Sequence, residues 1–147
     1  MGYALFAQRK LVLDGVVNSV QLQQTQRSDE QLRLSTNTLT LQSQVSNIQT
    51  SQSSVLGDLY NQLSSANDSN ERQSINNVIE AKQREFEREI QRINNKIYMT
   101  SIKENAIEME VKRLDTKLTA LQKQLEKIEE AEGNGIEKAT PQFNGIG

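Results

Sequence analysis

Residues 86–128 read FEREIQRINNKIYMTSIKENAIEMEVKRLDTKLTALQKQLEKI, and their apolar side chains follow a seven-residue repeat. Two series interleave, so the spacing alternates between three and four residues. The first series is Ile79, Phe86, Ile93, Thr100, Ile107, Leu114, Leu121 and Ile128, and the second is Ile90, Ile97, Glu104, Val111, Leu118 and Leu125. This repeat puts one apolar stripe on a helix and predicts a left-handed coiled coil with a neighbouring helix.

Two polar residues, Thr100 and Glu104, interrupt this stripe near its middle. One interpretation is a tolerated defect in an otherwise apolar seam. The other is a device that sets the register of the two helices, as a single buried polar residue does in some coiled coils.

A weaker version of the repeat precedes it in the chain. One series is Leu34, Leu41, Ile48 and Val55, and the interleaved series is Thr38, Val45, Gln52 and Leu59. Because Thr38 and Gln52 are polar, this stripe buries less apolar surface than its counterpart. We expect the two stripes to pack against each other within one chain.

A cluster of turn-forming residues, 66–70, separates the two repeats. Asp68 has the position of a helix N-cap, with Glu71 at the spacing of a capping box, and Ser69 is a rival cap. The sequence therefore predicts an all-α fold, a long antiparallel helical hairpin or coiled coil over residues 1–132. Arm one spans about 3–66, the turn 67–70 and arm two about 71–132; one continuous helix is the alternative.

The C-terminal segment 133–147 contains four glycines and the only proline of the chain. These residues disfavour a helix, so we predict a short non-helical tail that is disordered or extended against a neighbour.

The composition argues against an enzymatic function. Only 35% of the 147 residues are hydrophobic and 4% aromatic, and the chain has no His and no Cys. Their absence removes imidazole acid–base catalysis, thiol nucleophiles, disulfides and the common zinc sites. A net charge of -2 gives no electrostatic case for nucleic acid as a partner. We expect no enzyme, no cofactor and no metal site.

The N-terminal region is the most apolar part of the chain. The residues that we expect to form an assembly surface there are Tyr3, Leu5, Phe6, Leu11, Leu13, Val16, Val17 and Val20. They cover more than one side of a helix, so a single partner helix does not cover them all. The alternative is a local core made with the returning arm and the tail.

Charge is distributed unevenly between the arms. Residues 1–66 carry four Lys/Arg and four Asp/Glu, whereas 67–132 carry twelve and fourteen, and residues 35–57 carry none. A polar but uncharged helix tolerates packing on several sides, because burying an amide or hydroxyl costs less than burying an ion. We therefore expect arm one to contact other copies. The alternative is that its polar composition is a low-complexity bias without a role in contacts. Arm two has a basic ridge at 84, 88, 92 and 96, interpreted as a solvated face or an anion-binding stripe.

No stretch reaches the length of an apolar membrane span, and Arg9 and Lys10 interrupt the apolar start where a secretory signal has none. Export would therefore need a route without a cleaved leader. A cell-surface or extracellular location by such a route is favoured over the cytoplasm.

In composition and architecture, the chain resembles bacterial filament subunits such as flagellin end domains and type III secretion needle subunits. The shared features are the helical hairpin, the absence of Cys, the scarcity of aromatic residues and the 52 Ser, Thr, Asn and Gln residues. No diagnostic motif matches, so the resemblance assigns no functional residue. It implies a self-assembling structural subunit of a helical filament or tube, whose partners are copies of itself or a secretion-system protein. The alternative is a cytoplasmic coiled-coil adaptor, or an export chaperone or stalk protein of a secretion apparatus.

Overall fold

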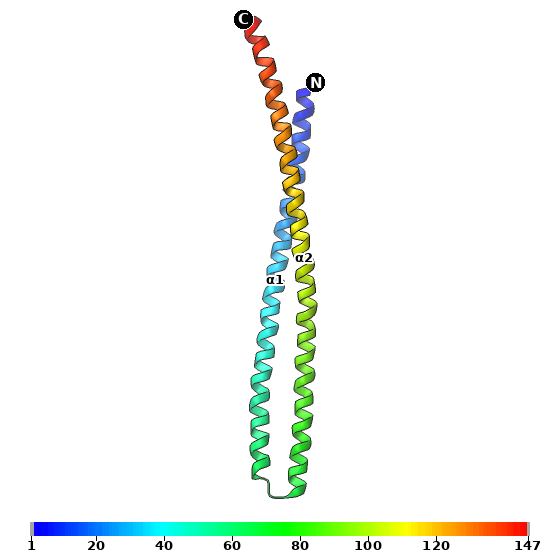
Figure 1. Ribbon diagram of the computed structural model, residues 1–147, viewed down its shortest axis with the longest axis vertical. Coiled ribbons are helices and arrows are strands. Elements are labelled where there is room, and N and C mark those ends of the chain that lie inside the picture. The colour runs from blue at the N-terminus through cyan, green and yellow to red at the C-terminus, as the bar shows by residue number, and fades with distance from the viewer. Residues whose placement is uncertain (1, 147) are drawn as a thin grey trace. The chain divides into compact units, whose positions relative to one another are not determined.

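The computed structural model describes the backbone of residues 2–146 and the side chains of residues 4–133. The described backbone consists of two helices, α1 (Gly2–Ser65) and α2 (Ser69–Ile146), joined by a short turn (Figure 1). This confirms the predicted all-α helical hairpin and excludes one continuous helix. The helices build two compact units, unit 1 from Met1–Gln31 with Ala106–Gly147 and unit 2 from Leu32–Asn105.

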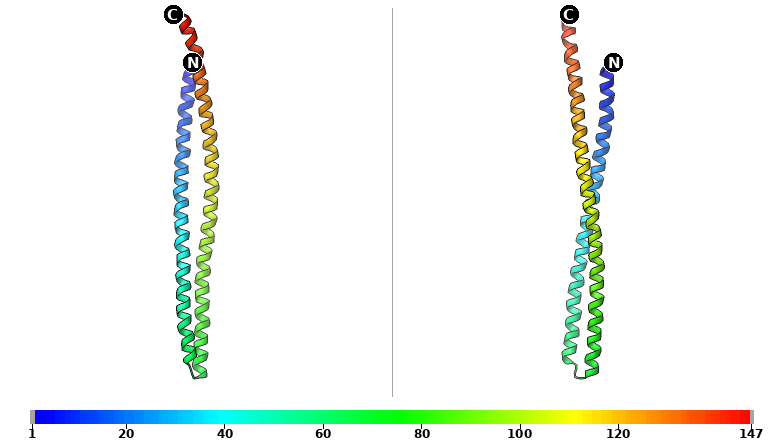
Figure 2. Two further views of the ribbon diagram at one scale, coloured as in Figure 1. Left: turned by 60° about the vertical axis from the view of Figure 1, so that its left-hand side comes forward. Right: turned by 45° about the vertical axis from the view of Figure 1, so that its right-hand side comes forward.

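In each unit a segment of α1 lies beside a segment of α2 in the opposite direction (Figure 2). Side-chain contacts between the helices show this direction in unit 1, where Lys10 pairs with Glu129 and Arg27 with Glu110. In unit 2, Thr38 contacts Glu104 and Tyr60 contacts Gln83. As the residue number rises along α1 it falls along α2, which is the pattern of an antiparallel pair.

The residues of the predicted seam all lie at buried or half-buried positions of the two helices. The buried ones are Leu41, Ile93, Ile107 and Leu114. The half-buried ones are Leu34, Val45, Ile48, Val55, Leu59, Phe86, Ile90, Ile97, Val111, Leu118, Leu121, Leu125 and Ile128. No large side chain among the described residues is completely buried. Two helices alone enclose a narrow stripe rather than a core, and much of their surface stays uncovered.

The turn occupies Ala66–Asp68, so α2 begins two residues before the predicted start at 71. The Oδ1 atom of Asp68 accepts a hydrogen bond from the backbone amide of Asn70 at 3.2 Å, and the Asp68 carbonyl accepts from the Arg72 amide at 3.0 Å. These two contacts make Asp68 the N-cap and leave the rival, Ser69, as the first helical residue. Arg72 also donates from Nε to the carbonyl of Ala66 at 2.8 Å.

Replacing Asp68 with alanine is expected to lower the free energy of unfolding by about 1 kcal/mol, because the Asn70 amide loses its acceptor. Urea unfolding followed by circular dichroism measures the change. Asn67→Ala is the matched control, since Asn67 lies exposed in the same turn outside the cap position. Equal losses in both variants would contradict the assignment of the cap.

The prediction of a non-helical tail is wrong for the described backbone, because α2 continues to Ile146. A helix commonly ends where a glycine adopts the left-handed conformation. None of the described glycines has a positive φ, so none of them provides such an end. Their helix propensity is poor by about 1 kcal/mol each relative to alanine, and that cost favoured the prediction. The side chains beyond Gly133 lie outside the described residues.

Candidate functional site

The structure divides the predicted assembly surface between the seam and the outside of α1. Val17 and Val20 are only 8% and 2% exposed, so they belong to the seam of unit 1 and not to an outer surface. Phe6, Leu13 and Val16 are half-buried. Leu5 and Leu11 remain exposed, and the side chain of Tyr3 lies outside the described residues. An assembly surface in unit 1 must therefore be built from residues other than Val17 and Val20.

Further large apolar side chains occupy outward positions that sequence reasoning did not single out. On α1 they are Val12, Leu22, Leu32, Leu39 and Tyr60, and on α2 Val78, Tyr98, Met99, Ile102 and Met109. Leu11 and Leu39, for example, are 73% and 66% exposed. Their signal in the sequence is an apolar residue at a position of the seven-residue repeat that points away from the partner helix. Apolar side chains that stand singly are ordinary on a protein surface, and only a contiguous patch of them marks a contact surface.

A groove between α1 and α2 in unit 1 collects part of this apolar surface. It has a volume of about 580 Å³, and its apolar walls are Leu5, Val12, Leu13 and Ile128. Its polar walls are Gln8, Arg9, Gln124 and Lys127. Among the described residues that line the groove, two are basic and none is acidic. The lining of the groove therefore combines apolar side chains with two basic ones.

In unit 1, some seam positions of α1 hold polar residues, so the apolar repeat is not apparent in the sequence there. Lys10 and Arg27 stand at seam positions, and Arg27 contacts two carboxylates. Its Nη1 donates to Glu30 at 2.7 Å and its Nε approaches Glu110 Oε1 at 3.1 Å. The hydrogen bond with Glu30, followed by the charge of Glu110, raises the pKa of Arg27. All three groups are partly exposed, so the cluster supports the pairing of the helices only modestly.

In unit 2 the two polar exceptions of the seam have different partners. Glu104 is half-buried, and its Oε1 accepts a hydrogen bond from Thr38 Oγ1 at 3.0 Å. Thr100 is 7% exposed and its Oγ1 donates to the carbonyl of Lys96 at 2.8 Å, within its own helix. The structure thus joins one polar residue of each predicted stripe, Thr38 and Glu104, in a single polar layer.

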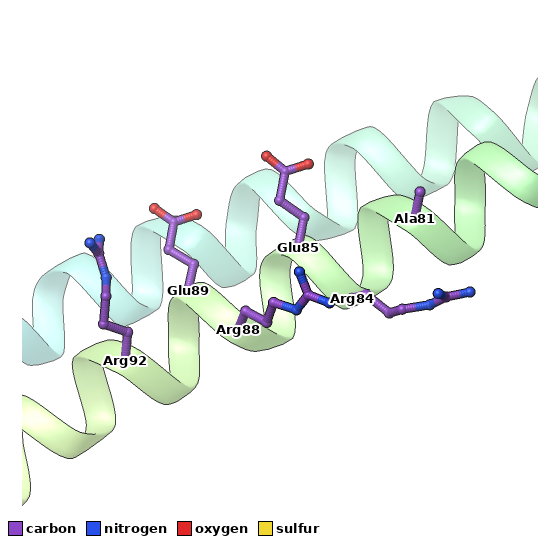
Figure 3. A pocket seen from close by; sticks show the side chains of 6 residues that line it. All are labelled: Ala81, Arg84, Glu85, Arg88, Glu89 and Arg92. Atoms are coloured by element: carbon purple, nitrogen blue, oxygen red, sulfur yellow. The ribbon is translucent and has the colours of Figure 1, made fainter.

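The two helices of unit 2 present opposite kinds of surface. The exposed residues of α1 between Ser35 and Gly57 are uncharged. On α2, a shallow depression with a volume of about 610 Å³ is lined by Ala81 and five charged residues, shown in Figure 3. They are Arg84, Glu85, Arg88, Glu89 and Arg92, and all extend from α2. Because carboxylates alternate with the arginines, the predicted basic ridge is a surface of mixed charge.

Among the described residues, no three carboxylates lie close enough together to hold a metal ion. None of the described helices has a stretch that is both long enough and apolar enough to cross a bilayer. Comparison with protein-family models, with curated proteins and with solved structures found no match. The function must therefore be argued from the surfaces of the two helices.

Proposed function

We propose that this protein is a structural subunit that assembles with copies of itself, as hairpins packed side by side in a helical filament or tube. The observation that carries the proposal is the outer surface of α1. Both helices expose large apolar side chains, but α1 differs in unit 2, where it has no charge over residues 35–57. Burial of such a surface removes apolar area from water without desolvating ions.

The composition of α2 supports different surroundings for the two helices. Its exposed surface at residues 84–92 of unit 2 alternates Arg and Glu, and Arg84 pairs with Glu80 at 3.4 Å one turn away. Pairs of this kind support a helix that faces water and resist burial against a neighbour. We infer that α1 meets other copies and that this part of α2 faces solvent.

The groove of unit 1 is the observation that favours a second candidate, a coiled-coil adaptor or export chaperone. A helix of another protein with apolar side chains would fit against Leu5, Val12 and Ile128. Such a protein would form a small complex of defined size rather than a polymer. The state of the purified protein separates the two candidates.

Purified protein at rising concentration is expected to form polymers that sediment and are visible by negative-stain electron microscopy. Leu39→Lys should raise the critical concentration about tenfold or more, because a lysine there places an unpaired charge in the contact. Ala81→Lys, in the exposed charged surface of α2 in the same unit, is the matched control and should leave it unchanged. Monomers or small oligomers at every concentration would contradict the proposed function.

A further inference from the structure

Unit 1 has two sides of opposite charge at one level of the helix pair. The groove lies on one side, where Arg9 and Lys127 flank the apolar Leu5, Val12 and Ile128. Both basic side chains are exposed. This side therefore offers a shallow groove of apolar and basic side chains, which suits an apolar side chain that has carboxylates beside it.

The acidic side of unit 1 is located by the contact between Lys10 Nζ and Glu129 Oε1, at 3.5 Å. Asp14 lies one helical turn after Lys10, and Leu11 lies three residues before Asp14, so Asp14 and Leu11 share this side of α1. Glu126 lies one turn before Glu129 on α2. Leu11 is 73% exposed, and Asp14 and Glu126 are also exposed.

Contacts with α2 confirm that these are different sides of the pair. Gln24 Nε2 donates to Asp115 Oδ1 at 3.4 Å, and Asp115 precedes Glu129 by two seven-residue repeats. Those two acidic residues therefore share one side of α2. Gln124 and Lys127, which line the groove, each directly precede a seam residue, whereas Glu126 and Glu129 each directly follow one. The two pairs therefore flank the seam on opposite sides. Each copy thus carries an apolar projection with acidic neighbours and, at a similar level, an apolar recess with basic neighbours.

We propose that the acidic side of unit 1, with Leu11 as its apolar projection, docks into the basic groove of the next copy. This inference rests on the proposed function and names the contact by which copies join. Leu11 would lie against Leu5, Val12 and Ile128 of the neighbour, and Asp14 and Glu126 would approach its Arg9 and Lys127. Opposite charges steer such an encounter and fix its register.

The charge pattern also selects the symmetry of the contact. A two-fold contact of groove on groove would bring Arg9 and Lys127 of one copy against the same residues of another. A two-fold contact of acidic side on acidic side would oppose Asp14 and Glu126 in the same way. Like charges in contact oppose both arrangements. A contact between two different surfaces leaves one of each free at the ends, so growth continues into an open polymer.

Two charge-reversed variants test the contact. The groove variant is Arg9→Glu with Lys127→Glu, and the acidic-side variant is Asp14→Lys with Glu126→Lys. Each alone should raise the critical concentration about tenfold or more, because every contact would oppose like charges. An equimolar mixture should polymerise with restored efficiency, since the reversed groove of one variant matches the reversed acidic side of the other. The matched control, Arg84→Glu with Arg88→Glu on α2 of unit 2, should behave as the wild type.

Circular dichroism melting of the two test variants is expected to match that of the wild type, because the four reversed side chains are exposed. Restored sedimentation of the mixture supports the proposal. If the wild type and both variants polymerise equally well, this contact is overturned and the proposed function is unaffected. Variants that fail alone and also fail when mixed overturn it as well. Wild-type protein that never polymerises overturns the proposed function and this contact together.

Discussion

Replacement of Val20 by aspartate is expected to lower the free energy of unfolding by about 3–5 kcal/mol, since a buried charge without a partner has that cost. Val20 is 2% exposed, and it lies in unit 1 between the Lys10–Glu129 and Gln24–Asp115 contacts. Those contacts hold α2 over it, so the carboxylate would be excluded from water. Urea unfolding followed at 222 nm, at a protein concentration too low for assembly, measures the loss.

The matched control is Leu22→Asp, two residues later on the same helix. Leu22 is 59% exposed, so its aspartate stays in water and the free energy of unfolding should change by less than about 0.5 kcal/mol. Similar losses in the two variants would contradict the division of this region into a seam and an outer surface. Helix content by circular dichroism at 25 °C is expected to fall only in the Val20 variant.

The repeat in residues 86–128 was sufficient to predict the hairpin, because a strict seven-residue period is useful only to a helix that lies along another helix. The turn followed from the cluster of turn-forming residues 66–70, in which Asp68 was the cap candidate with Glu71 at capping-box spacing and Ser69 the rival. The hydrogen bond from the Asn70 amide decides for Asp68. The pairing of the two stripes joins residues as distant as Thr38 and Glu104, but the helical period and the cap depend on interactions that are local along the chain. Such interactions leave a direct pattern in the sequence.

The division of the N-terminal region depended on an interaction that is not local. Val16 and Val17 are adjacent and equally apolar, yet Val17 is buried and Val16 half-buried. The seam of α1 in this region passes through Lys10, Gln24 and Arg27, so apolar residues alone do not trace it. Each of these three polar residues contacts a carboxylate of α2. Which residues of α1 are buried depends on its register against α2, and the sequence of α1 alone does not specify that register.

Replacing Glu104 with leucine is expected to raise the free energy of unfolding by about 1–2 kcal/mol, since a half-buried seam position gains apolar burial. The loss of its hydrogen bond from Thr38 has little cost. The Thr38 hydroxyl can donate to a carbonyl of its own helix, as Thr100 does to Lys96. Urea unfolding measures the gain, with Lys103→Leu, an exposed neighbour, as the control for added apolar surface.

The double variant Thr38→Val with Glu104→Leu decides between the two interpretations of this polar layer. A tolerated defect predicts a more stable protein of unchanged oligomeric state, because only a weak point of the seam is repaired. A register device predicts a gain in stability together with new species. An uninterrupted apolar seam no longer distinguishes the intended pairing from pairings shifted by one repeat or formed between chains. Light scattering after size-exclusion chromatography, at a concentration below assembly, counts the species. We expect one species for the wild type and at least two for the double variant, because Thr38 and Glu104 meet only in the register observed in unit 2.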